Sequence, residues 1–255
     1  ADHMDTIGHS LVPEQNQKQY RELVAQQFAP LAKEVGWNAK ADDSDEEKAL
    51  RASLLEILGS AGDRDAVAAA RKITQSYIKD PTSIEGTIVG PALAVAAENG
   101  DAVLYEQLAQ GMASARSTED YYHFLFALTS FRQPELAQRT LALVDQGKIR
   151  QQDYVRIFPA LLSEPSAREI AWDYLKAHWD SLAEKVTTFG GSGAVSALGG
   201  FCSIEKRDEI KQFFTEHRAP GAERALQQSL ERIGACVEFK QLQSDNMQKF
   251  LQQTQ

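Results

Sequence analysis

The five histidines are the residues best suited to hold a metal ion or to move a proton, and their spacing argues against both roles. They are followed in the sequence by Met, Ser, Phe, Trp and Arg, so none begins the H-E-x-x-H pattern that places two zinc ligands on one helix face. No two lie close enough to suggest another ligand pair; they are His3, His9, His123, His178 and His217. We therefore expect no metal ion, no cofactor and no catalytic residue in this chain.

The glycine-rich stretch 190–193 is the second candidate for chemistry. Its residues, Gly-Gly-Ser-Gly, are similar to a nucleophile elbow or a phosphate-binding loop. However, Ala194 stands where the elbow requires glycine, no strand pattern precedes the stretch, and no Gly-Lys-Ser/Thr follows it. The pattern favours a turn between two helices.

The two cysteines, Cys202 and Cys236, are too few for a disulfide framework. Neither has a histidine nearby in the sequence, so we expect two buried thiols. His178 and His217 are expected to close helices, where a cation interacts favourably with the helix dipole.

Two further groups of residues have structural explanations. The acidic run 42–47 lacks the central glycine and the closing glutamate of a calcium loop, so we interpret it as a solvated helix start. Trp172, Tyr174 and Trp179 fall on one expected helix and its exit, which indicates core packing rather than a cofactor site.

The elements that would position any of these groups are helices. Apolar residues recur at steps of three and four along most of the chain, as in Leu226, Leu230, Ile233 and Val237. Ser44 with Glu47 and Ser117 with Asp120 have the spacing of capping boxes at helix starts. Strand-like alternation never persists for five residues. The sequence predicts an all-α protein.

Short breaks between the helical patterns recur with a rhythm. Their second residues are Asp63, Asp101, Pro134, Pro165 and Ser203, at steps of 38, 33, 31 and 38. A helix–turn–helix unit repeated at such a period is typical of an α-solenoid. We expect stacked antiparallel helix pairs of HEAT- or armadillo-like type, in a curved array with a concave face.

Composition limits the classes of partner. The chain of 255 residues has a formal net charge of -9 and no basic tract, which argues against nucleic acid and anionic membranes. No apolar run approaches the ~20 residues of a membrane span, and the first residues lack the regions of a signal peptide. We expect a soluble protein and leave its compartment open. Residues 1–10 are expected to be a disordered lead, and residues 11–255 a single helical domain.

Three stretches of the chain carry a family resemblance. The first consists of Ile-Arg-Gln-Gln-Asp at 149–153, Glu-Pro-Ser-Ala-Arg-Glu at 164–169, Ala-Trp-Asp-Tyr-Leu-Lys at 171–176 and Trp179. The second is Glu-Ile-Lys-Gln-Phe-Phe at 209–214, continuing over 220–233. The third is Phe-Ala-Pro-Leu at 28–31 with Gly-Trp at 36–37. Together they resemble the C-terminal helical, HEAT-like domain of zinc aminopeptidases of the puromycin-sensitive and endoplasmic-reticulum aminopeptidase family. The resemblance spans about 12–251, with Glu164 in place of the common Asn and Ala167 in place of the usual Gly.

The resemblance implies a non-catalytic role. The family's H-E-x-x-H, its G-A-M-E-N motif and its catalytic Tyr are absent from this chain and belong to preceding domains. In the family, the C-terminal domain closes over the catalytic domain, forms the substrate chamber, gates access and touches the C-terminal part of the peptide. The implied partners are the catalytic domain of the same polypeptide and a peptide, and zinc is implied only for the parent protein.

An alternative is a free-standing HEAT-like scaffold that binds another protein through its concave face. In the favoured interpretation the chain alone is not an enzyme, and it should carry an exposed apolar patch where its partner packs.

Two arginines are candidates for contacting the carboxylate of a bound peptide, because Arg pairs with carboxylates through two N–H groups. Arg168 follows Pro165 at an expected helix start, where free backbone N–H groups also favour an anion. Arg156 lies on the preceding expected helix and could face the same space. A surface or interhelical salt bridge is the competing explanation for either residue.

Overall fold

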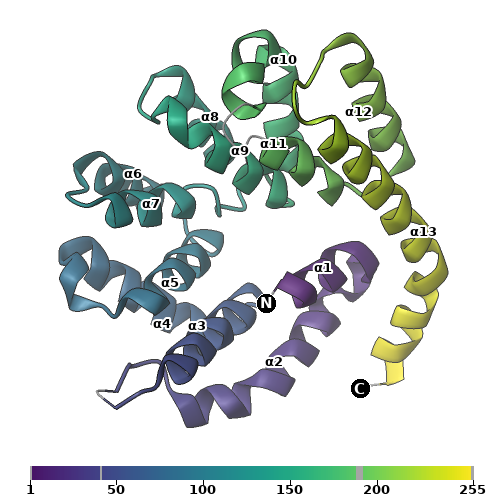
Figure 1. The fold of residues 1–255 in the computed structure, drawn as a ribbon. Helices are drawn as coiled ribbons and strands as arrows, with labels where there is room; N and C mark the ends of the chain where they lie inside the picture. Colours follow the sequence, from purple (N-terminus) through teal and green to yellow (C-terminus); the bar gives the residue numbers. More distant parts are fainter. Residues whose placement is uncertain (1, 41, 188–191, 254–255) are drawn as a thin grey trace. The chain divides into compact units, whose positions relative to one another are not determined.

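The computed structural model describes residues 2–40, 42–187 and 192–253. Within these ranges the chain forms thirteen α-helices and four short 3-10 helices, without a strand (Figure 1). The all-α prediction and the packing of helices on their sequence neighbours, as in a solenoid, are confirmed. The chain divides into two compact units: unit 1 is Ala1–Phe131 with Ser244–Gln255, and unit 2 is Arg132–Gln243.

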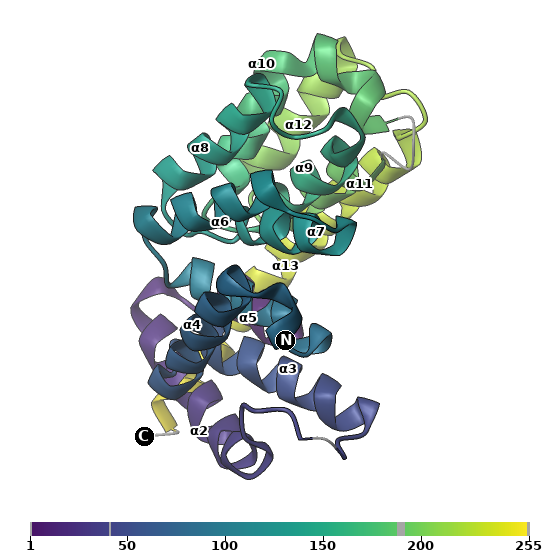
Figure 2. The same cartoon turned by 90° about the vertical axis from the view of Figure 1, so that its left-hand side faces the viewer.

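Unit 1 contains seven complete helices and the end of an eighth. They are α1 (Asp2–Leu11), α2 (Gln17–Val35), α3 (Asp45–Ser60), α4 (Arg64–Lys79), α5 (Gly86–Glu98), α6 (Ala102–Ser114), α7 (Thr118–Ala127) and the end of α13 (Glu223–Gln253), with 3-10 turns η1 (Glu14–Asn16) and η2 (Pro81–Ser83). Helix α3 packs against α2, α4 and α5, and α6 packs against α7. Figure 2 shows α3, α4 and α5 side by side.

The core between α3, α4 and α5 is made of small and medium apolar side chains. Ala66, Ala70, Ala92 and Ala96 are fully buried there together with leucines of α3. Gly59 of α3 allows the closest approach, since a Cβ at this position would lie 2.3 Å from a methyl carbon of Val95 on α5. The small residues therefore set how closely these helices pack.

The first ten residues differ from the expectation of a disordered lead. Asp2–Leu11 forms α1, and Met4 and Ile7 pack into a cluster with Val12, Tyr20, Val24 and Leu251. The hydroxyl of Tyr20 donates a hydrogen bond of 2.8 Å to the carbonyl of Met4. Burial of one apolar side of α1 explains its order, a signal that the polar residues around it obscured in the sequence.

Unit 2 contains α8 to α12 and the first part of α13. The bounds are α8 (Pro134–Asp145), η3 (Gln151–Asp153), α9 (Tyr154–Ser163), α10 (Arg168–Thr187), α11 (Ser192–Ala197), η4 (Leu198–Gly200) and α12 (Ile204–Glu216). Helix α9 packs against α10 and α11, and α10 also packs against α8. Gly190 and Gly191 of the expected turn lie outside the described residues, whereas Ser192 and Gly193 begin α11.

The interior of unit 2 confirms the prediction that the tryptophans pack in the core. Trp172 is fully buried and Trp179 is 4% exposed. Both rings meet Phe213 and Phe214 of α12 at centroid distances between 5.1 and 6.0 Å. Their N–H groups also have acceptors: Trp172 donates to Glu209 and Trp179 to the carbonyl of Arg218. Large rings and satisfied N–H groups therefore hold α10 against α12.

The helix starts and breaks predicted from the sequence are largely confirmed. Four of the five breaks fall between helices, and Pro134 of the fifth is the first residue of α8. Ser44 and Glu47 form both bonds of a capping box. Ser117 accepts from the backbone N–H of Asp120, but the Asp120 carboxylate binds side chains instead of closing the second box.

Two local expectations are wrong. His178 does not close a helix, because α10 continues to Thr187; its Nδ1 lies 2.9 Å from the carbonyl of Tyr174. His217 does stand at the C-terminal end of α12, as expected. In the acidic run 42–47, Asp43 is not solvated: its side chain is 4% exposed and forms an ion pair of 2.8 Å with the buried Arg51.

Candidate functional site

Arg168 lies in unit 2 at the first residue of α10, as the sequence predicts. Its Nε donates to the carbonyl of Leu162 at 2.6 Å, its Nη2 to the carbonyl of Ser163 at 2.8 Å, and its Nη1 to the carbonyl of Gly200 at 2.6 Å. Leu162 and Ser163 end α9, where the last carbonyls have no partner inside the helix. Arg168 thus caps the carbonyl end of α9 and ties it to the segment before α12.

The surroundings of Arg168 are partly apolar. Its guanidinium lies over the ring of Phe201, 5.7 Å from the ring centroid. Burial lowers the pKa of Arg168 below its usual value, while the charges of Glu164 and Glu169 oppose that shift. Three of the five guanidinium N–H groups donate to backbone carbonyls, which gives Arg168 a structural role. The other two N–H groups could donate to another acceptor.

Arg156 is exposed on α9, about two helical turns before the end that Arg168 caps. It therefore belongs to the same helix–helix corner of unit 2. That both arginines face one space stays a prediction.

A polar network that the sequence analysis missed lies in unit 1. The hydroxyl of Tyr77 on α4 donates to the carboxylate of Asp120 on α7 and lies 3.0 Å from Nδ1 of His123. A phenol has one proton, so with Asp120 as its acceptor the Nδ1–H of His123 must donate to the Tyr77 oxygen. Asp120 also accepts from the hydroxyl of Ser117.

The pKa directions agree with this assignment. Burial, followed by the bond to Asp120, raises the pKa of Tyr77, and burial lowers that of His123. Hydrogen bonds from Tyr77 and Ser117 outweigh burial and lower the pKa of Asp120. The network links α4 to α7 beside a surface hollow of about 320 Å³, and the Asp120 carboxylate that lines the hollow is already bonded to Tyr77 and Ser117. The only sign of this network in the sequence was the spacing of Ser117 and Asp120, which we interpreted as a capping box.

A second charged cluster connects α10 with α12. Glu209 accepts from Trp172, Lys176 and Lys206, and Lys206 also pairs with Glu169. Although burial opposes it, the hydrogen bonds from Lys176, Lys206 and Trp172 lower the pKa of Glu209 to about 2. Burial opposes a rise in the pKa of either lysine, but the bond to Glu209 raises the pKa of Lys176, and the bonds to Glu169 and Glu209 raise that of Lys206. This cluster has the character of a structural interhelical contact.

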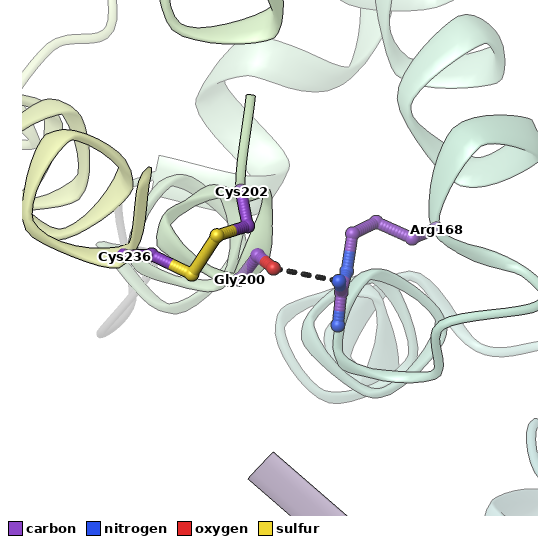
Figure 3. Close-up of a disulfide and its surroundings, with 4 residues drawn as sticks. All are labelled: Arg168, Gly200, Cys202 and Cys236. Carbon is purple, nitrogen blue, oxygen red and sulfur yellow. Dashed lines mark hydrogen bonds between the residues drawn. A yellow bond between two sulfur atoms is a disulfide. The ribbon is translucent and has the colours of Figure 1, made fainter. Parts of the chain in front are cut away.

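The expectation of two buried thiols is wrong. Cys202 and Cys236 form a disulfide with Cα atoms 5.4 Å apart, and no free cysteine remains among the described residues (Figure 3). The sequence showed only two isolated cysteines, and pairing residues 34 positions apart requires knowing that α13 returns past the start of α12.

Metal ligation has no support in the part of the chain that the structure describes. There, no three His, Cys, Asp or Glu side chains gather in a way that could hold an ion. The residues present therefore do not fit a zinc site, and no chemical step can be assigned to one here. Among the described helices, none combines the length and apolar character that a bilayer crossing requires.

Large apolar side chains are exposed on α13. In unit 2, Phe239 is 52% exposed and Leu242 64% exposed. Their spacing of three residues places them on one helix face. Two side chains make a smaller surface than the contiguous apolar patch expected where a partner packs.

Comparison with known proteins gives a consistent family. The family model described as "ERAP1-like C-terminal domain" matches residues 1–235. Aminopeptidase 2, mitochondrial, of Saccharomyces cerevisiae is 26% identical over 245 residues, covering 94% of this chain and 26% of the yeast protein. Aminopeptidase M1-C of Oryza sativa subsp. japonica is 29% identical over 225 residues, covering 84% of this chain and 25% of the rice protein. The chain thus spans about a quarter of the length of the curated relatives it matches.

Proposed function

The chain belongs to the family of ERAP1-like C-terminal domains, and from this premise we propose that it is the non-catalytic C-terminal domain of a zinc metallo-aminopeptidase. In this role it closes over the catalytic domain of the same polypeptide, helps to form the substrate chamber, gates access to it and contacts the C-terminal part of the peptide. The zinc and the catalytic residues belong to the parent's catalytic domain.

The observation that carries the proposal is the family match over residues 1–235, together with full-length relatives that are named aminopeptidases. The sequence supports a non-catalytic role for this chain, since no histidine is followed by glutamate and the H-E-x-x-H pattern is absent.

The contact with the peptide carboxylate is the most specific part of the proposal. We assign the direct contact to Arg156, because it is the exposed arginine of the two and three N–H groups of Arg168 bind backbone carbonyls. Arg168 then acts mainly by holding the end of α9, the helix that carries Arg156. A charge-assisted pair in a partly dehydrated chamber is worth roughly 1.5–3 kcal/mol, whereas an exposed ion pair is worth about 0–1 kcal/mol.

The test uses the full-length parent with two forms of one peptide, the free acid and the C-terminal amide. We expect kcat/KM to favour the free acid, and Arg156→Ala to reduce that preference roughly tenfold, which corresponds to about 1.4 kcal/mol. Arg224→Ala, which removes an exposed arginine elsewhere in unit 2, is the matched control and should leave the preference unchanged.

Two results would contradict the carboxylate contact. One is a parent enzyme that treats acid and amide alike. The other is an equal loss of preference in Arg156→Ala and Arg224→Ala, which would show a general effect of surface charge.

A further inference from the structure

The first half of α13 is fastened to the segment 195–203 along three successive helical turns. Ser229 donates to the carbonyl of Val195 at 2.8 Å, and Arg232 donates to the carbonyl of Ser196 at 2.6 Å. One turn further on, Cys236 is bonded to Cys202. Two polar contacts and one covalent bond therefore follow one face of α13, and the disulfide is the last of the three.

The same segment is also held from its other side. Figure 3 shows the carbonyl of Gly200 bound by Arg168 of α10, with the disulfide on the opposite side of the segment. Gly199 makes room for α13, because a Cβ there would lie 2.7 Å from Nε of Arg232. The segment is thus a joint at which the end of α9, the start of α10 and the first half of α13 are fixed together.

Two polar contacts hold α13 on this segment beside the disulfide. Ser229 and Arg232 set the position of α13 on the segment, and the fully buried Ser229 hydroxyl is satisfied by that contact. Reduction would leave these polar contacts in place, so the pair reforms readily when an oxidant is present. Such a pair acts as a covalent latch on a preformed contact.

We propose that the Cys202–Cys236 disulfide is a structural latch and that the protein acquires it by folding in an oxidising compartment. In its formation two thiols lose two protons and two electrons, and an oxidised dithiol protein or oxidised glutathione is reduced to two thiols in exchange. Structural disulfides persist in extracytoplasmic spaces and are rare where glutathione and thioredoxin keep thiols reduced. The compartment, which the sequence left open, is thereby assigned by the paired cysteines.

The latch has a measurable stabilising effect. It closes a loop over 34 positions, which restricts the unfolded chain. For a protein of this size we expect dithiothreitol to lower the melting temperature by about 5–10 °C. Cys202→Ser/Cys236→Ser should melt at the temperature of the reduced wild type and show no response to dithiothreitol.

The experiment first counts thiols in the full-length parent taken from its source cells, quenched in acid and treated with a maleimide in denaturant. We expect Cys202 and Cys236 to be unreactive before reduction and both reactive after it. The chain itself is then produced with and without export to an oxidising compartment, and its melting is followed with and without dithiothreitol.

Two results would overturn the proposal. Reactive Cys202 and Cys236 in the parent as isolated would exclude the oxidising compartment. An unchanged melting temperature on reduction of the disulfide-bonded chain would exclude the latch. The second measurement uses wild-type protein, so it holds even if the double variant fails to fold.

Discussion

The α3–α5 region of unit 1 and the α10–α12 region of unit 2 solve the same packing problem with different side chains. In unit 1, Gly59 meets Val95 directly, and buried alanines fill most of the remaining contact. In unit 2, Trp172 and Phe213 fill the space between α10 and α12. At the edge of this contact, Glu209 pairs with Lys176 and Lys206.

The difference shows which changes each region can tolerate. Close helix contacts built from small residues have no room for added atoms, so they are sensitive to enlargement. Contacts built from large rings derive their stability from buried area and satisfied N–H groups, so they are sensitive to truncation. The following predictions test this contrast.

The largest effect is expected from Trp172→Ala in unit 2. The fully buried ring fills the interface with Phe213, and its removal leaves a cavity and deprives Glu209 of a donor. We expect a loss of about 3–5 kcal/mol in the free energy of unfolding, measured by denaturant titration with circular dichroism. Trp37→Ala at the partly buried edge of the unit 1 cluster should cost clearly less. Equal losses would remove the proposed contrast.

A smaller effect of opposite origin is expected from Gly59→Ala in unit 1. Overpacking against Val95 costs about 1–3 kcal/mol, and the better helix propensity of alanine offsets at most ~1 kcal/mol, so a net loss of about 1 kcal/mol should remain. Gly234→Ala on α13 is the matched control, since a Cβ there meets no atom within 4 Å beyond its own helix backbone and chain neighbours. That variant should gain roughly 0.5–1 kcal/mol. The same sign in both variants would show that helix propensity, and not crowding, decides.

The smallest effect concerns pH. The pKa of Glu209 is about 2 in the folded chain against 4.5 as its ordinary value, so its stabilising contribution is complete above about pH 4.5 and is lost as pH falls toward 2. Because this carboxylate is about one third exposed, we expect the contribution to be only about 1 kcal/mol.

Glu209→Gln should therefore destabilise the chain near neutral pH and flatten the acid side of its stability curve. Further acid dependence comes from Asp43, Glu47 and Asp120 of unit 1, whose pKa values are also lowered. Thermal melts of the variant and the wild type across this range provide the measurement. Parallel curves for the two proteins would contradict the assignment to Glu209.

The features that the sequence predicts well are local. Ser44 and Glu47 lie three residues apart, and Pro134 stands at the first turn of α8, so neighbouring residues alone determine these helix starts. The continuation of α10 past His178 was also readable, since neither Gly nor Pro occurs between 179 and 189.

The features that the sequence did not predict join residues that are distant along the chain. Cys202 with Cys236 and Trp172 with Glu209 are 34 and 37 positions apart, and Tyr77 reaches His123 across 46. Such pairs depend on which helix faces meet, and periodicity shows only that a face is apolar. For the candidate site, the sequence placed Arg168 at a helix start but could not show that three backbone carbonyls occupy its guanidinium.

The cluster that joins α1, α2 and the end of α13 has a consequence for the connectivity of the chain. Met4 and Leu251, from opposite ends of the sequence, share one set of apolar neighbours within unit 1. Unit 2 is therefore an insertion within unit 1, entered after Phe131 and left before Ser244. Within this chain, a short linker that joins α1 to the end of α13, with new termini opened in an exposed turn, gives a circular permutant that keeps this cluster. A chain cut at residue 235, where the family match ends, loses Met247 and Leu251 and so removes part of the cluster that covers Tyr20.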